Sequence, residues 1–208
     1  MALEIETPHG PARAHLHTVD APRGALVLGH GAGGGIEAPD LVAATRAALS
    51  VGIATVLVEQ PYRVAGRRSP APAPQLDAAW VAVIEHLRGS ELAGLPLVVG
   101  GRSLGARVAC RTAAATGAAG VLCLAFPLAP PARAGNPRQS RLAELDAVHV
   151  PTLVVQGDRD PFGMPPPSAT REVVAVGGDH GLKADLDAVA AAVRAWIARV
   201  VAAATSLA

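Results

Sequence analysis

The stretch Val98-Val99-Gly100-Gly101-Arg102-Ser103-Leu104-Gly105-Ala106 determines how the rest of the chain is interpreted. The apolar run from Leu95 to Val99 predicts a buried strand, and the run of small residues from Leu104 to Ala115 predicts a helix. Gly101-Arg102-Ser103-Leu104-Gly105 has the G-x-S-x-G spacing of a tight strand-to-helix turn that exposes a serine hydroxyl at a sheet edge. Ser103 is therefore a candidate nucleophile, and the alternative is an ordinary loop between strand and helix.

Length and composition indicate one domain with a large core. The chain has 208 residues, of which 50% are hydrophobic and 2% aromatic, so we expect a single domain over residues 1–208 built on Ala, Val and Leu. A net charge of +1 gives no reason to expect nucleic acid or an anionic membrane as partner. Cys110 and Cys123 fall in apolar segments and are expected to be buried free thiols.

The N-terminal segment lacks the basic and apolar regions of a signal peptide. We also expect no run that is long and apolar enough to cross a bilayer. These observations predict a cytoplasmic protein and leave its oligomeric state open.

Apolar runs alternate with helical patterns along the chain. A hairpin is expected within residues 2–19, and the remaining segments are predicted as strands at 25–29, 53–58, 95–99, 120–125, 152–156 and 171–176 and as helices at 40–49, 76–87, 104–115 and 186–200. This alternation predicts an α/β fold, a mainly parallel sheet with helices on both faces. Between residues 126 and 150 we expect only a short helix, about Arg138 to Leu145, and therefore no lid domain.

A serine nucleophile needs a base, and the base needs an orienting acid. His180 alone among the seven histidines follows both the last predicted strand and the serine. Asp160 follows the turn at Gly157 and is favoured as the acid, with Asp158 as the alternative that otherwise shapes the turn. Asp179 is expected to make only local contacts.

An oxyanion formed at this site needs two backbone donors. We expect them to be the N–H groups of Leu104 and Ala32, with Gly33 as an alternative to Ala32, while His30 shapes the loop by hydrogen bonding. A different function is suggested by Gly29-His30-Gly31-Ala32-Gly33-Gly34, which matches the G-x-G-x-x-G of dinucleotide-binding folds, with Glu59 as the ribose-binding acid. Residues 35–39, however, separate the third glycine from the next helix.

Taken together, these motifs resemble those of the α/β-hydrolase superfamily over essentially the whole chain. The segments that carry the resemblance are Leu28-Gly29-His30-Gly31-Ala32-Gly33, Gly101-Arg102-Ser103-Leu104-Gly105, Val155-Gln156-Gly157-Asp158-Arg159-Asp160-Pro161 and Gly178-Asp179-His180. The chain is similar to the small, lidless, dienelactone-hydrolase-like branch, and within it to a family that includes a testis-expressed protein and a subunit of a histone-acetyltransferase complex. The resemblance implies a triad of Ser103, Asp160 and His180, although dienelactone hydrolases proper carry cysteine as the nucleophile.

The expected activity is hydrolysis of a carboxylic ester or thioester, with a small-molecule substrate and with Ser103, His180 and Asp160 as the triad. The alternative is a hydrolase-fold binding module with a weak or unused site. An apolar acyl wall and a basic rim are the candidate substrate contacts, and they comprise Phe126, Pro127, Leu128, Phe162 and Met164 for the wall and Arg63, Arg67, Arg68 and Arg102 for the rim. The chain has no zinc-type Cys/His spacing and no P-loop, so we expect neither a metal nor a cofactor.

Overall fold

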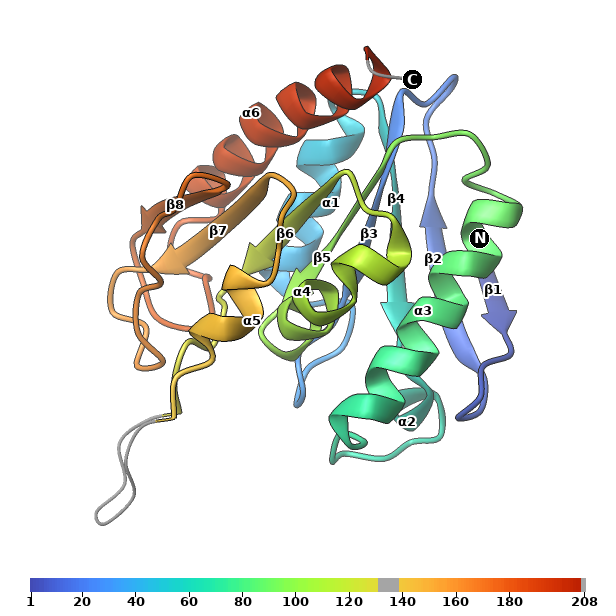
Figure 1. Cartoon of the computed structure of the whole chain (residues 1–208), viewed down its shortest axis with the longest axis horizontal. Coiled ribbons are helices and arrows are strands. Elements are labelled where there is room, and N and C mark those ends of the chain that lie inside the picture. Colours follow the sequence, from blue (N-terminus) through green and yellow to red (C-terminus); the bar gives the residue numbers. More distant parts are fainter. Residues whose placement is uncertain (131–138, 207–208) are drawn as a thin grey trace.

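The structure is a computed structural model that describes residues 1–130 and 139–206. Its centre is a twisted eight-stranded sheet of order β1-β2-β4-β3-β5-β6-β7-β8 (Figure 1). The strands are β1 (Ala2–Ile5), β2 (Ala12–His17), β3 (Gly24–Gly29), β4 (Ile53–Glu59), β5 (Leu97–Arg102), β6 (Gly120–Leu124), β7 (Thr152–Gly157) and β8 (Arg171–Val176). The pairs β1–β2 and β2–β4 are antiparallel and the other pairs are parallel, which confirms the predicted edge hairpin and parallel sheet.

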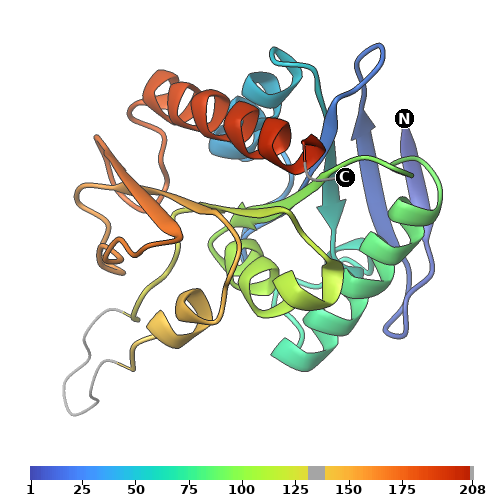
Figure 2. The ribbon, with the colours of Figure 1, turned by 45° about the horizontal axis from the view of Figure 1, so that its top comes forward.

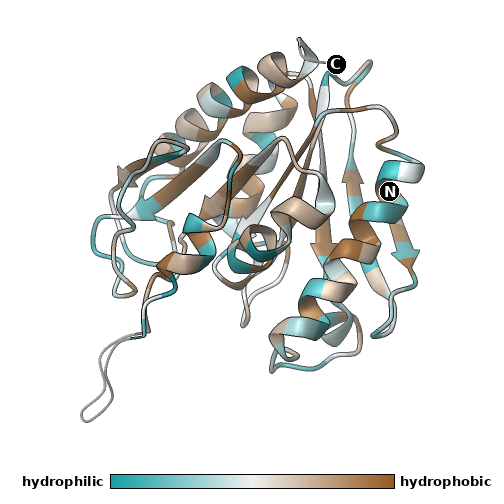
Figure 3. Cartoon of the chain, in the orientation of Figure 1, coloured by the Kyte–Doolittle hydropathy of each residue, from teal (hydrophilic) through white to brown (hydrophobic). Residues whose placement is uncertain are grey.

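Helices cover both faces of the sheet (Figure 2). They are α1 (Pro39–Leu49), α2 (Pro61–Val64), α3 (Ala73–Gly89), α4 (Leu104–Thr116), α5 (Leu142–Asp146) and α6 (Leu186–Thr205). The helices α1 and α6 pack together on one face, whereas α3, α4 and α5 lie on the other. Hydrophobic strands therefore lie between two apolar layers (Figure 3), as the near-continuous apolar runs predicted.

The helix predicted at 76–87 is α3, and the apolar residues that repeat along it are buried. On α3 the buried residues include Leu76, Trp80, Val83, Ile84 and Leu87, one face of a helix at i, i+3 and i+4 spacings. Trp80 on this side of the sheet and Trp196 on the other are each 1% exposed, so each of the two apolar clusters buries one indole. The thiols of Cys110 and Cys123 are buried and free, as expected.

Two predicted segments differ from the structure in detail. Between the strand predicted at 53–58 and the helix predicted at 76–87 lies a short helix that was not expected, α2, which begins at Pro61 because proline fits the first turn of a helix. The short helix expected from Arg138 to Leu145 is α5, which begins only at Leu142; Arg138 lies outside the described residues. Within the described part of the segment between β6 and β7, α5 is the one helix.

The prediction that no run is long and apolar enough to cross a bilayer was wrong for α6. By length and composition this helix, Leu186–Thr205, passes that test. Its alanines raise its apolarity, while its larger side chains form one stripe that packs on the sheet and on α1, with Val193, Trp196 and Ile197 buried. The length and composition of α6 therefore match those of a core helix as well as those of a membrane span.

Candidate active site

Ser103 occupies a strained turn between β5 and α4. Its backbone angles are φ 52° and ψ −104°, a region that residues with a side chain rarely adopt. Gly101 and Gly105 allow the turn to approach the end of β3: a Cβ atom on Gly101 would lie 2.5 Å from the carbonyl oxygen of Gly29, and one on Gly105 would lie 2.6 Å from the carbonyl carbon of the same residue. The two glycines of the motif are therefore needed because two strand ends and a helix start meet here.

The structure brings Ser103, His180 and Asp160 into one hydrogen-bonded chain. His180 Nε2 lies 2.9 Å from Ser103 Oγ, and His180 Nδ1 lies 2.8 Å from Asp160 Oδ2. A carboxylate can only accept, so His180 donates from Nδ1 and its Nε2 is free to accept the serine proton. The Asp160 side chain is fully buried and the His180 side chain is 19% exposed, so the imidazole is the part of the pair that solvent reaches.

Asp160 is held by groups that the sequence did not identify. Gln156, at the end of β7, is fully buried and donates from Nε2 to Asp160 Oδ2 at 2.8 Å. The backbone N–H of Phe162 donates to Asp160 Oδ1 at 2.9 Å. A glutamine inside a buried apolar strand is unusual, and this was the one sequence signal that pointed to Gln156.

The neighbouring aspartates, Asp158 and Asp179, accept hydrogen bonds from nearby backbone N–H groups. Asp158 Oδ1 accepts from the N–H of Gly178 at 2.8 Å, which joins the loop after β7 to the loop after β8. Asp179 Oδ1 accepts from the N–H of Gly181 at 2.8 Å. The structure thus places Asp160 and not Asp158 against His180.

The expected oxyanion donors lie at the start of α4 and in the loop after β3. Leu104 is the first residue of α4, where the N–H groups have no acceptor within the helix. The half-buried Ala32 is held through its carbonyl oxygen, which accepts from the Tyr62 hydroxyl at 3.1 Å. Gly33 is exposed. The donor roles of Ala32 and Leu104 stay predictions.

His30 shapes this loop, as the sequence suggested. Its Nδ1 donates to the Gly31 carbonyl at 2.8 Å, and its Nε2 accepts from the N–H of Gln60 at 3.1 Å. Both ring nitrogens are thus used by the neutral imidazole. Burial lowers the pKa of His30 below its ordinary value of 6.5, which keeps the ring in that neutral form.

The guanidinium of Arg102, expected at an anionic substrate, is engaged within the protein, and its role toward a substrate stays a prediction. Arg102 Nε lies 3.0 Å from Asp40 Oδ2, and Nη2 donates to the carbonyl oxygen of His180 at 3.0 Å. The other arginines of the expected basic rim, Arg63, Arg67 and Arg68, lie on α2 or directly after it. Their role toward a substrate stays a prediction.

The expected acyl wall is only partly available. Phe126 and Pro127 are buried, and Phe126 belongs to the core between the sheet and α4, so their assignment to a substrate wall was wrong. Phe162 is half-buried and packs on His180, with ring centroids 4.4 Å apart. Leu128 is half-buried and Met164 is 41% exposed. These three residues remain as candidates for an apolar rim.

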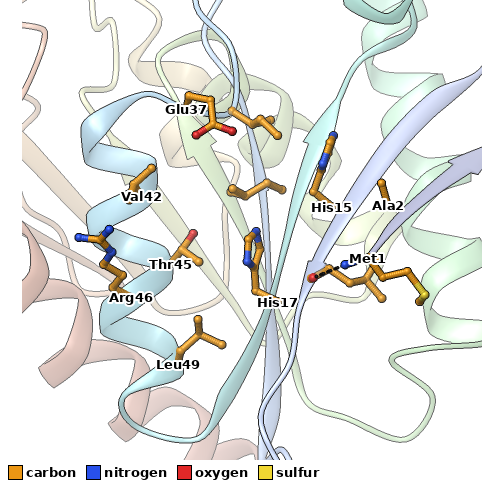
Figure 4. A pocket seen from close by; sticks show the side chains of 12 residues that line it. Met1, Ala2, His15, His17, Glu37, Val42, Thr45, Arg46 and Leu49 are labelled. Atoms are coloured by element: carbon orange, nitrogen blue, oxygen red, sulfur yellow. Dashed lines mark hydrogen bonds between the residues drawn. The ribbon is translucent and has the colours of Figure 1, made fainter.

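A separate cavity of about 570 Å³ lies between α1 and the β1–β2 hairpin (Figure 4). His15 and His17 line it from the sheet side, and Val42, Thr45 and Leu49 line it from α1. Ser103, His180 and Asp160 do not line this cavity. Across residues 1–130 and 139–206, no three or more His, Cys, Asp and Glu side chains are grouped to hold a metal ion.

Comparison of sequences shows the family of the chain. Residues 22–204 match the sequence profile of a family described as an alpha/beta hydrolase domain. The chain belongs to this α/β-hydrolase family. No curated protein matches the chain.

Solved structures with this fold include several α/β hydrolases. XC6422 from Xanthomonas campestris, described as a serine hydrolase without a lid, has a TM-score of 0.76 and 20% identity, over 96% of this chain and 94% of its own. Est1E from Butyrivibrio proteoclasticus has a TM-score of 0.76 and 17% identity, over 97% of this chain and 99% of its own. A dienelactone hydrolase from Anabaena variabilis has a TM-score of 0.76 and 17% identity, over 96% of this chain and 96% of its own. The fold is therefore that of lidless serine hydrolases and dienelactone-hydrolase-like proteins, while the finer resemblance to the testis-expressed protein stays a prediction.

Two observations argue against the dinucleotide-binding alternative. The helix after the glycine-rich loop begins at Pro39, well beyond Gly34, so its N-terminus is not formed by the third glycine. Glu59, the expected ribose-binding acid, instead contacts His15 Nε2 at 2.8 Å.

Proposed function

We propose that this α/β hydrolase is a serine hydrolase that cleaves carboxylic esters or thioesters. The observation that carries the proposal is the continuous chain from Ser103 Oγ through His180 to the buried Asp160. Such a chain activates a serine because the imidazole accepts its proton while the carboxylate fixes the tautomer.

In the proposed reaction, Ser103 Oγ bonds to the carbonyl carbon of the substrate as its proton passes to His180 Nε2. The carbonyl electron pair moves to the oxygen, which the N–H groups of Ala32 and Leu104 stabilise. Collapse expels the alcohol or thiol, which takes up the proton from His180. A water molecule then repeats the sequence on the acyl-enzyme and releases the acid and Ser103. Asp160 keeps its charge throughout and stabilises the imidazolium.

The surroundings of the site favour an apolar acyl group. Phe162 and Leu128 are half-buried and Met164 is exposed, so an acyl chain that contacts them would remove apolar surface from water. Est1E has been solved with ferulic acid bound, so aromatic esters belong with aliphatic ones among the substrates to be tested.

A panel of chromogenic esters and of thioesters, with acyl groups of increasing length and an aromatic member, tests the proposal. The wild-type protein is expected to hydrolyse at least one of them, and Ser103→Ala is expected to lower kcat by about 10³-fold or more, as loss of a triad member does in serine proteases. A folded wild-type protein that hydrolyses none of them would contradict the proposal and favour the binding-module alternative.

A further inference from the structure

Arg102, which lies between Gly101 and Ser103 in the G-x-S-x-G motif, lies beside three separate segments of the site. Its Nε pairs with Asp40 at the start of α1, at 3.0 Å. Its Nη2 donates to the carbonyl oxygen of His180, in the loop after β8, at 3.0 Å. Its Nη1 lies beside Gly31, in the loop after β3: a Cβ atom added to Gly31 would lie only 2.9 Å from Nη1.

We propose that Arg102 is a positioning residue that fixes the His180 loop and the expected oxyanion loop relative to Ser103. This inference rests on the proposed hydrolase function and deepens it. Arginine suits this task because its planar guanidinium directs several N–H groups in fixed directions, so one side chain can hold several partners at once. Ser103 follows Arg102 directly in the chain, so the nucleophile and this anchor share one rigid turn.

Asp40 determines where the guanidinium lies. The Asp40 side chain is fully buried, and its Oδ1 also accepts from the N–H of Leu41 at 3.0 Å. Burial raises the pKa of Asp40 and the charge of Arg102 opposes that rise, so the two groups depend on each other. A buried charge left without its partner is strongly destabilising, which gives the pair a structural role in addition to the proposed one.

Arg102 holds the backbone of His180 itself. In the glycine-rich segment Gly177-Gly178-Asp179-His180-Gly181, Gly178 is bonded to the loop after β7, and Asp179 bonds within the segment and to Leu182. The imidazole is held at Nδ1 by Asp160, and its backbone is held at the carbonyl oxygen by Arg102. Loss of the second contact allows the ring to shift while the Asp160 contact remains, and this lengthens the 2.9 Å distance to Ser103 Oγ.

The experiment compares Arg102→Met, Arg102→Lys and the double variant Arg102→Met/Asp40→Asn with the wild-type chain. Active sites are counted by titration with a fluorophosphonate, and kcat per titrated site, KM and the thermal midpoint are measured on the preferred ester. A matched control is Arg199→Met, which breaks the exposed bidentate pair between Arg199 and Glu172, away from the site.

For Arg102→Met, kcat per titrated site is expected to fall about 10- to 100-fold with KM little changed, because a displacement of about 1 Å in a catalytic group has that order of effect. Arg102→Lys keeps a charge beside Asp40 but has a single point donor, so its thermal midpoint should recover more than its rate. The double variant removes the unpaired buried charge, so it should regain thermal stability over Arg102→Met while kcat per site stays low. Arg199→Met should match the wild type in both measurements.

Two results would overturn the inference, and they are distinguishable from a failure of the proposed function. If the double variant recovers wild-type kcat per site, Arg102 serves only to neutralise Asp40. If Arg102→Met lowers the number of titrated sites but not the rate per site, its role is structural stability alone. A folded wild-type chain that neither reacts with the fluorophosphonate nor turns over any ester would instead overturn the proposed function and this inference with it.

Discussion

The side-chain amide of Gln156 donates to the same carboxylate oxygen of Asp160 that accepts from His180, with 2.8 Å for each contact. Gln156 Nε2 also lies within hydrogen-bond distance of the carbonyl oxygens of Phe126 and Gly163. The buried glutamine thus ties the proposed catalytic acid to the loops on either side of it.

Replacing Gln156 should therefore weaken catalysis through Asp160. Gln156→Met keeps the volume but removes the donor, and loss of one such hydrogen bond is worth about 1–3 kcal/mol, or roughly a 5- to 150-fold fall in kcat/KM. Gln156→Glu places a second carboxylate beside Asp160, and repulsion between the two like charges should lower kcat/KM as well. Initial rates of the three proteins provide the measurement. Equal kcat/KM for Gln156→Met and wild type would show that Asp160 does not need this support.

Replacement by asparagine should lower kcat far more at Asp160 than at Asp158, the other aspartate of the loop after β7. Asp160→Asn allows the imidazole to take the wrong tautomer, and the same change in a serine protease lowers kcat by ~10⁴-fold. Asp158→Asn keeps an acceptor for the N–H of Gly178 and should lower kcat less than about 10-fold. The two substitutions are matched in chemistry and lie in one loop, so kcat on one ester decides between them. A more severe loss in Asp158→Asn would reverse the assignment.

Gly105→Ala should destabilise the protein and inactivate it. The added methyl group would overlap the backbone of Gly29 and lie 2.9 Å from the carbonyl oxygen of His30, and overpacking of this kind typically lowers the free energy of unfolding by about 1–3 kcal/mol. The matched control is Gly35→Ala, since nothing lies within 4 Å of its Cβ position. Chemical denaturation and ester hydrolysis measure both effects. Wild-type behaviour of Gly105→Ala would mean that the turn is not packed as described.

His30 should make folding stability depend on pH. Its folded pKa lies below the ordinary 6.5, because burial disfavours the charge and Nε2 must stay unprotonated to accept from Gln60. The unfolded chain therefore binds more protons below pH 6.5, so the contribution of this group is fully present above that pH and is lost as the pH falls.

The free energy of unfolding from pH 7 to about pH 5 tests this prediction, because a group with a depressed pKa acts in that window. His30→Gln should show a shallower decline than the wild type, and comparison of the two proteins cancels the other titrating groups. The exposed His86, on α3, provides the matched control as His86→Gln. Parallel curves for wild type and His30→Gln would contradict the prediction.

The fold was predictable because its signals are local. Leu76, Trp80 and Ile84 repeat at helical spacing and are buried on α3, and the apolar runs became strands whose ends lie within three residues of the expected bounds. The arrangement of Ser103, Asp160 and His180 could be predicted from the sequence for a related reason. Each residue follows its own strand, and the carboxyl ends of parallel strands meet at one edge of the sheet.

The supporting contacts were not predictable because they join segments far apart in the chain. Asp40 has the position of an ordinary acidic residue in the first turn of a helix, and only the structure shows it paired with Arg102. Phe126 was expected in the acyl wall, yet its side chain is buried in the core. Sequence periodicity gives the face on which a residue lies, but not the partner that its side chain reaches.

The central claim, that Ser103 is an activated nucleophile, is tested most directly by reaction with a fluorophosphonate followed by mass spectrometry of the modified peptide. We expect one adduct per chain, located on Ser103, absent from Ser103→Ala and formed much more slowly in His180→Ala, with both variants folded by circular dichroism. No adduct on the folded wild-type chain, or an adduct on a different residue that persists in Ser103→Ala, would contradict the claim.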